Sequence, residues 1–137
     1  MSAAPSALLA QLHALETRET EAVSELGGAA ATFAGLLDES RGMARSLLRR
    51  LGDRPSLEGE RVALLVSPGI AWAKTLFAII YAGGIAVPLS PLHPVNELAY
   101  FAADADIAAA FVSADLADRR PAFGGRPVLG PEELTPV

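Results

Sequence analysis

The chain has 137 residues, of which 51% are hydrophobic and 20% charged, and it carries a formal net charge of −5. This length is that of about one domain, and so apolar a composition excludes intrinsic disorder. The acidic excess argues against nucleic-acid binding, and the absence of cysteine excludes disulfide scaffolds and thiolate metal sites, so we expect a soluble, cytoplasmic globular protein.

The first part of the chain predicts two helices separated by weaker elements. Leucines at helical spacing indicate a short helix over 5–16, while 17–28 is polar and undecided. A short strand is expected over 29–33. The stretch 34–51 predicts a stronger helix, with an apolar stripe on one side and a row of arginines on the other. We interpret the arginine row as a solvated face rather than an anion site.

The second part alternates strands and helices. Residues 61–66 and 107–112 are apolar on both faces, as in buried parallel strands. Helices are predicted over 70–82 and 94–104, with a short strand over 85–89 between them. Because this order specifies parallel pairing with right-handed crossovers, we expect an α/β fold with a three-layer parallel sheet.

After residue 113 the pattern weakens. Residues 118–121 suggest a helix end or a loop, and 127–129 a last strand. We divide the chain into an N-terminal helix with its polar lead-in (1–28), a strand–helix piece with a linker (29–58) and a βαβαβ unit with an open C-terminus (59–137). Ser67-Pro68-Gly69 is expected to supply the N-cap and first-turn proline of the 70–82 helix.

No membrane segment or signal peptide is predicted. The start of the chain lacks a positively charged region. The stretch 75–92 is uncharged and approaches the roughly 20 residues that span a bilayer. It is interrupted by Gly83-Gly84, Pro88 and Pro91, which would leave backbone groups unsatisfied in lipid. We therefore read it as a buried helix followed by a buried strand.

The residue types that could carry chemistry have simpler structural interpretations. Gly83-Gly84 is followed by neither lysine nor Ser/Thr, so it predicts a helix cap rather than a phosphate loop. Lys74, the only lysine, falls in mid-helix, where a snorkelling side chain is expected. His93 is interpreted as a loop or helix-start residue, because no nucleophile or orienting carboxylate is placed beside it in sequence.

The remaining candidates are interpreted in the same way. His13 is expected to be solvated on the terminal helix, and Asp104 and Asp106 to belong to a helix-ending turn rather than to a metal site. Three aromatic residues at helical spacing are assigned to the core or to contacts between packed units: Trp72, Tyr81 and Tyr100. The sequence thus predicts no catalytic, cofactor-binding or metal-binding residue.

Several segments resemble one family. They are Thr32-Phe33-Ala34-Gly35-Leu36, the block from Gly59 to Leu65, Ser67-Pro68, the run from Tyr81 to Leu89, and the run from Pro91 to Tyr100. Together they resemble the N-terminal region of the AMP-forming acyl-CoA synthetases, members of the adenylate-forming superfamily. The resemblance covers 29–112, and its Pro-Leu-His-Pro variant is similar to malonyl-CoA-synthetase-like members. The family usually has Ser-Gly after the residue matched by Asp104 and an acidic residue at Gly69, so the sequence departs at both places.

The resemblance implies an acid–thiol ligase that uses ATP, Mg²⁺ and coenzyme A. In the family, a Ser/Thr/Gly-rich loop ending in Pro-Lys-Gly holds the ATP phosphates, and a Glu, an Asp and a C-terminal lysine complete the site. None of these motifs is present in the 137 residues. We therefore expect a scaffold that binds none of these cofactors alone and is inactive alone.

Three further hypotheses stay open. The chain could be one subunit of a split synthetase, with a partner chain supplying the nucleotide site. It could be a non-catalytic module that binds a full-length relative, or a truncated reading frame without function. For the scaffold hypothesis, the expected partner is the remainder of the synthetase. The helix over 36–51 and the unit over 62–112 are expected to belong to different packed subdomains.

Overall fold

The structure is a computed structural model, which describes residues 7–134. Its centre is a parallel sheet of four strands in the order β4-β3-β5-β6. The strands are β3 (Arg61–Leu65), β4 (Ile85–Pro88), β5 (Ile107–Val112) and β6 (Val128–Leu129). Within residues 7–134, no helix is long and apolar enough to cross a membrane. The expected parallel α/β architecture is confirmed.

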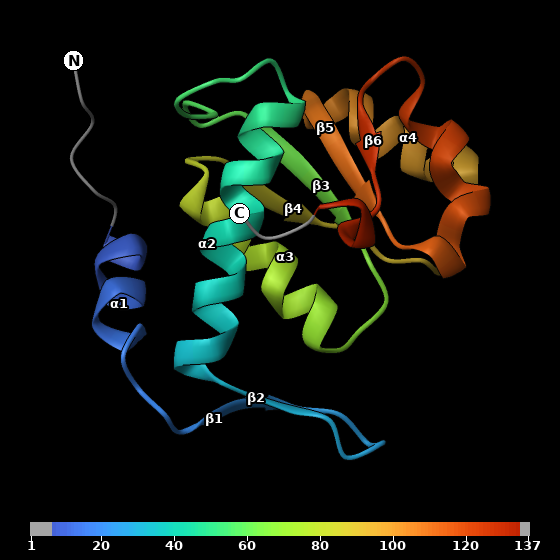
Figure 1. Cartoon of the computed structure of the whole chain (residues 1–137). Helices are drawn as coiled ribbons and strands as arrows, with labels where there is room; N and C mark the ends of the chain where they lie inside the picture. Colours follow the sequence, from blue (N-terminus) through green and yellow to red (C-terminus); the bar gives the residue numbers. More distant parts are fainter. Residues whose placement is uncertain (1–6, 135–137) are drawn as a thin grey trace.

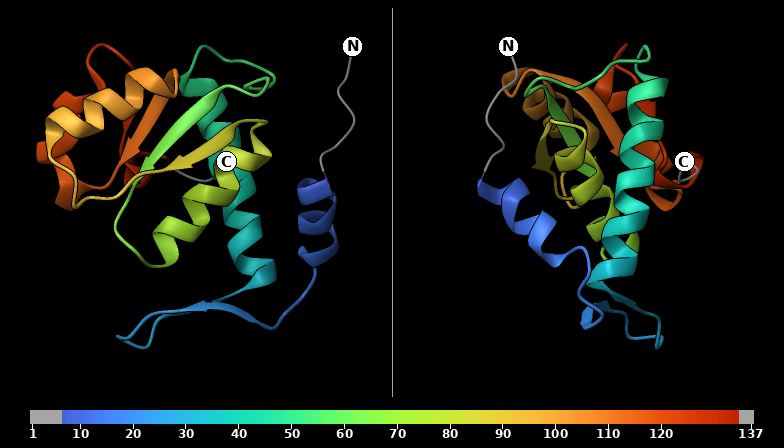
Figure 2. Two further views of the ribbon diagram at one scale, coloured as in Figure 1. Left: turned by 180° about the vertical axis from the view of Figure 1, so that it is seen from behind. Right: turned by 60° about the vertical axis from the view of Figure 1, so that its left-hand side comes forward.

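Helices cover both faces of this sheet (Figures 1 and 2). On one face lie α2 (Phe33–Arg50) and α3 (Ile70–Tyr81); on the other lie α4 (Val95–Asp104) and the 3₁₀ segment η1 (Ala114–Phe123). Successive β3 side chains enter opposite cores, so the strand is buried on both sides. This explains why its sequence is a continuous apolar run rather than an alternating one.

Helix α2 packs against α3 and shares one hydrophobic core with the sheet. Met43, Ala44 and Leu47 of α2 lie in the same cluster as Val62 and Leu64 of β3. Thr32 caps the helix: its Oγ1 accepts a hydrogen bond from the Gly35 N–H at 3.1 Å. The expectation that this helix and the βαβαβ unit belong to different packed subdomains was wrong, because the apolar stripe of α2 is buried on that unit.

The N-terminal elements lie outside the sheet. Helix α1 (Ala7–Leu15) lies beside α2, and an antiparallel hairpin of β1 (Glu21–Ser24) and β2 (Ala30–Thr32) leads from α1 into α2 (Figure 1). Leu12 is the buried residue of α1. The short strand expected over 29–33 is confirmed as β2, and its partner β1 falls in the stretch that the pattern left undecided.

The later elements follow the predicted order closely. The strand over 107–112 has the expected bounds, and the helices over 70–82 and 94–104 differ by one residue at one end. Residues 118–121 belong to η1, which connects β5 to β6. A short 3₁₀ turn, η2 (Pro131–Glu133), follows β6.

Candidate functional site

The topology of the sheet singles out the carboxyl ends of β3 and β5. These two strands are neighbours, yet the chain leaves β3 toward α3 on one face and leaves β5 toward η1 on the other. In open α/β sheets such a switch point forms a crevice that often binds ligands. The residues at this edge are therefore the first place to look for a functional site.

Three polar residues join the two strand exits, and we call them the carboxyl-end cluster: Ser67, Ser113 and Asp115. The Ser67 N–H donates to Ser113 Oγ at 3.2 Å, and the Ser67 hydroxyl donates to the Asp115 carboxylate. Hydrogen bonds from the Ser67 and Ser113 hydroxyls hold the pKa of Asp115 below its ordinary value. The cluster thus keeps an exposed carboxylate ionised and ties the loop after β3 to the loop after β5.

The start of α3 differs from the sequence-based expectation. Ser67 and Pro68 were predicted as the N-cap and first-turn residue, but the N-cap is Gly69, which has no side chain to cap the helix. Glu25 supplies the acceptor instead, since its Oε2 lies 3.3 Å from the Ile70 N–H. A carboxylate at a helix N-terminus is favoured by the free N–H groups and the helix dipole.

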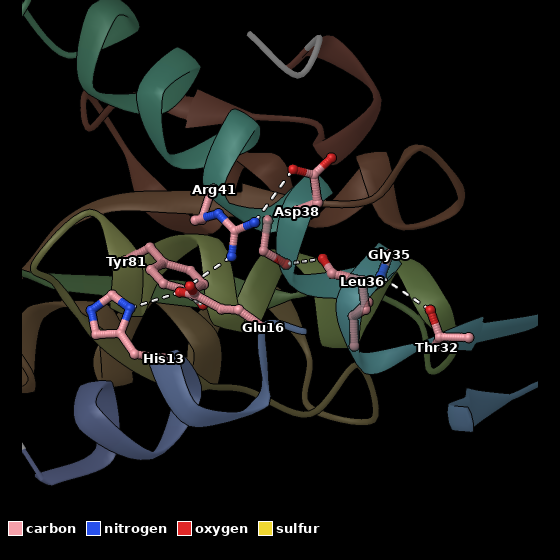
Figure 3. A network of polar contacts seen from close by, with 9 residues as sticks. His13, Glu16, Thr32, Gly35, Leu36, Asp38, Arg41 and Tyr81 are labelled. Carbon is pink, nitrogen blue, oxygen red and sulfur yellow. Dashed lines mark hydrogen bonds and ion pairs between the residues drawn. The ribbon is translucent and has the colours of Figure 1, made fainter. Parts of the chain in front are cut away.

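A second polar network joins α1 to the core (Figure 3). We call it the Glu16 network. Glu16 Oε1 accepts a hydrogen bond from the Tyr81 hydroxyl at 2.9 Å and lies 2.7 Å from His13 Nδ1 and 3.2 Å from Arg41 Nη1. Arg41 also pairs with Asp38 at 3.3 Å. Because Tyr81 is on α3 and Arg41 on α2, this network connects three helices.

The Glu16 network lowers the pKa of Glu16 and raises the pKa values of Arg41 and Tyr81. Burial opposes ionisation of Glu16, but hydrogen bonds from Tyr81 and His13 and the charge of Arg41 outweigh it and lower the pKa of Glu16. Burial, together with the hydrogen bond to Glu16, raises the pKa of Tyr81 to about 12. These directions are those expected of a structural ion pair.

Gly83 and Lys74 each have close neighbours in the structure. Gly83 has φ +84° at the end of α3, and a Cβ there would meet the Ser56 side chain. The helix-end interpretation of Gly83-Gly84 is confirmed. Lys74 Nζ lies 3.3 Å from Glu39 Oε2, so the chain's only lysine is already paired.

The remaining predicted candidates lie apart from one another. His93 Nδ1 is 2.8 Å from Glu97 Oε2, and its ring contacts Phe101 edge-on at 5.1 Å between centroids. Asp104 ends α4, and Asp106 follows in a turn at φ +52°, as expected for a helix-ending turn. In the part of the chain that the structure describes, no group of three His, Asp or Glu side chains could hold a metal ion.

Sequence reasoning missed both polar clusters. For the carboxyl-end cluster a signal was available, since Ser67 and Ser113 each follow closely on an apolar strand, and the ends of neighbouring parallel strands meet at one edge. For the Glu16 network none was available, because Glu16 is 65 residues from Tyr81 and lies in a polar stretch. His13 was expected to be solvated; its side chain is half exposed, but it is paired with Glu16.

Comparison with known proteins gives a consistent likeness. The model of the family described as AMP-binding enzyme matches residues 11–133. A CoA ligase of Gibberella moniliformis is 34% identical over 93 residues, 67% of this chain. The mitochondrial malonate–CoA ligase of Mus musculus is 35% identical over 74 residues, 53% of this chain. The chain spans 16% and 13% of the lengths of these two relatives.

Solved structures agree with the sequence matches. The ATP-bound structure of MatB from Rhodopseudomonas palustris superimposes with a TM-score of 0.72 at 26% sequence identity. The match covers 90% of this chain and 25% of MatB. The parallel sheet and its flanking helices are therefore the arrangement found in the corresponding part of that protein.

Proposed function

This chain belongs to the AMP-binding enzyme family, and from that membership we propose that it forms the N-terminal scaffold of an acid-activating ligase. The observation that carries the proposal is the family match over residues 11–133, most of the described fold. The substrate class is a carboxylic acid, and the product class is a coenzyme A thioester. The names of the two ligase relatives support this class.

Within such a ligase, these residues support the site and leave phosphate binding to other residues. Triphosphate binding calls for backbone N–H groups of a glycine-rich turn together with a cation. Gly83-Gly84 lies at a helix end against Ser56, and Lys74 is held by Glu39. This glycine pair and this lysine therefore do not fit ATP phosphates, and we derive no catalytic step from them.

We propose that the chain contributes to such a ligase by holding loops in position. The carboxyl-end cluster fixes the loops that leave β3 and β5, and Glu25 fixes the start of α3 beside them. In the proposed ligase this edge forms one wall of the acyl or coenzyme A channel. Its hydroxyl and carboxylate groups bond to one another, which gives the wall a defined shape without a reacting group.

Carboxylate-dependent exchange of pyrophosphate into ATP tests the proposal. The 137-residue chain is assayed alone and mixed with a polypeptide that carries the remaining part of a family member, including its Pro-Lys-Gly loop. We expect no exchange by either polypeptide alone and exchange above background in the mixture, with acids such as malonate as substrates. Exchange by the chain alone would overturn the scaffold role.

A chimaera provides the second arm of this test. The segment of MatB that corresponds to this chain is replaced by the chain itself, and a monodisperse, folded chimaera is assayed for ATP binding. Retained ATP binding is the expected result, since the substituted segment supplies the support and the rest of MatB supplies the phosphate contacts. A folded chimaera that no longer binds ATP would show that the replaced residues contact the nucleotide directly, against the proposal.

A further inference from the structure

A pocket lies at the opposite edge of the sheet from the carboxyl-end cluster. It has a volume of about 370 Å³ and opens between the C-terminal end of α2, the turn that follows it and the first residues of β3, β5 and β6. Ligand pockets in proteins range from about 300 to 1,000 Å³. The pocket is therefore large enough for a compact organic molecule.

Two arginines and one carboxylate form the polar part of this pocket. Arg54 Nη1 lies 2.5 Å from Glu60 Oε1, an ion pair that raises the pKa of Arg54 and neutralises its charge locally. The Arg50 side chain is exposed, and its guanidinium has no hydrogen-bond or ion-pair partner among residues 7–134. One guanidinium thus remains uncompensated at the mouth of the pocket, and its planar fork matches a carboxylate.

The C-terminal end of a helix carries partial negative charge on its free carbonyl groups, which disfavours an anion nearby. At the end of α2 this effect is reduced. Its last carbonyls accept hydrogen bonds from the chain that turns back over them: Leu48 O from Arg54 N–H at 3.0 Å and Arg49 O from Asp53 N–H at 3.2 Å. Since these carbonyls are occupied, less negative charge faces the pocket.

The rest of the pocket is apolar. Leu57, Val62 and Ala109 are buried, and Leu51 and Pro127 complete the lining. Ala108 also lines it, at an irregularity in β5: Arg61 pairs with Ile107 but Val62 pairs with Ala109, so Ala108 is an extra residue. Bulges of this kind are rare in parallel pairs and are over-represented beside active sites. The pocket combines one free cation with an apolar floor and an irregular wall.

From this combination we propose that the pocket binds a monocarboxylate with a compact apolar body. The carboxylate pairs with the Arg50 guanidinium, and the apolar body covers the floor formed by Val62 and Ala109. A second negative group would find no free cation among the residues that line the pocket, because Arg54 is paired with Glu60. The pocket is separate from the carboxyl-end cluster, and its assignment does not rest on the proposed function.

NMR titration of the ¹⁵N-labelled 137-residue chain at fixed ionic strength tests this site. Benzoate is the probe, benzamide is its neutral counterpart, and inorganic phosphate is an anion without an apolar body. We expect benzoate to shift the amides of Val62, Ala108 and Ala109 saturably, with a dissociation constant on the order of a millimolar. Benzamide and phosphate should give no saturable shift of these amides.

Two variants with equal charge change locate the binding. Arg50→Gln removes the free guanidinium, and Arg49→Gln removes a neighbouring exposed guanidinium that does not line the pocket. Arg50→Gln should weaken benzoate binding about tenfold, as expected for losing a charge-assisted pair, while Arg49→Gln should leave it unchanged. Equal weakening by both variants, equal binding of phosphate, or no saturable shift would each overturn the proposal.

Discussion

Gly69 is a residue at which backbone conformation and side-chain space both disfavour a larger residue. Its φ is +148°, and a Cβ would lie 2.5 Å from Glu25 Oε2. We predict that Gly69→Ala lowers the free energy of unfolding by about 1–3 kcal/mol, the usual cost of such backbone strain. Urea denaturation measures this. Gly27→Ala is the control, because no atom lies within 4 Å of a Cβ there; equal stability of the two variants would contradict the prediction.

Tyr81 offers a second test at the residue scale, because its hydroxyl donates to a carboxylate between helices. Tyr81→Phe keeps the ring and removes only this hydrogen bond, so the free energy of unfolding should fall by about 1–2 kcal/mol. The matched control is Tyr100→Phe, since the side chain of Tyr100 is 66% exposed on α4. Thermal or urea unfolding that is unchanged in Tyr81→Phe would show that the bond does not stabilise the native state.

At the scale of one element, helix α1 depends on the Glu16 network, because only Leu12 is buried in it. The pKa of Glu16 is lowered in the folded state, so its stabilisation is complete above the ordinary value of 4.5 and is lost as the pH falls through the lower folded value. The raised pKa of Tyr81 sets a limit at high pH. The stabilisation that the Tyr81 hydroxyl provides is lost as the pH rises from the ordinary value of 10.0 toward about 12.

Hydrogen exchange of the α1 amides against pH measures this dependence. We predict that protection of α1 falls below pH 4.5 while protection of β3 and β5 persists, since the polar partners of Glu16 lie on the helices α1, α2 and α3. Glu16→Gln cannot titrate and should abolish the acid-dependent step. An acid midpoint that is the same in both proteins would assign the loss of protection to other carboxylates.

Some strands could be predicted from their sequences and others could not. For β3 and β5 the continuous apolar runs were sufficient, because burial between two helical layers removes every polar position. For β1 there was no such run, since it is a four-residue strand that pairs with β2 outside the main sheet, and its side chains are at most partly buried. Partner choice over long distances was equally hidden, as the Glu25 contact with α3 and the Glu16 contact with Tyr81 each depend on the completed fold.

At the scale of the whole molecule, the chain is a parallel sheet covered on both faces that matches a small part of its relatives. It shares the family over residues 11–133 and spans 16% of a CoA ligase to which it is 34% identical. We propose that, in the complete ligase, the residues of this chain form a structural wall at one edge of the sheet and take no part in the chemical steps. Gly83-Gly84 lies at the end of α3 against Ser56, and Lys74 is paired with Glu39, so we propose that other residues of the ligase hold the triphosphate.

Isothermal titration calorimetry of the purified 137-residue chain with ATP and Mg²⁺ tests most directly whether this chain binds the nucleotide by itself. We predict heats no larger than those of dilution throughout the titration. One-site saturable binding in the micromolar range that disappears when Mg²⁺ is chelated would contradict the scaffold role. It would mean that residues of this chain bind the nucleotide directly.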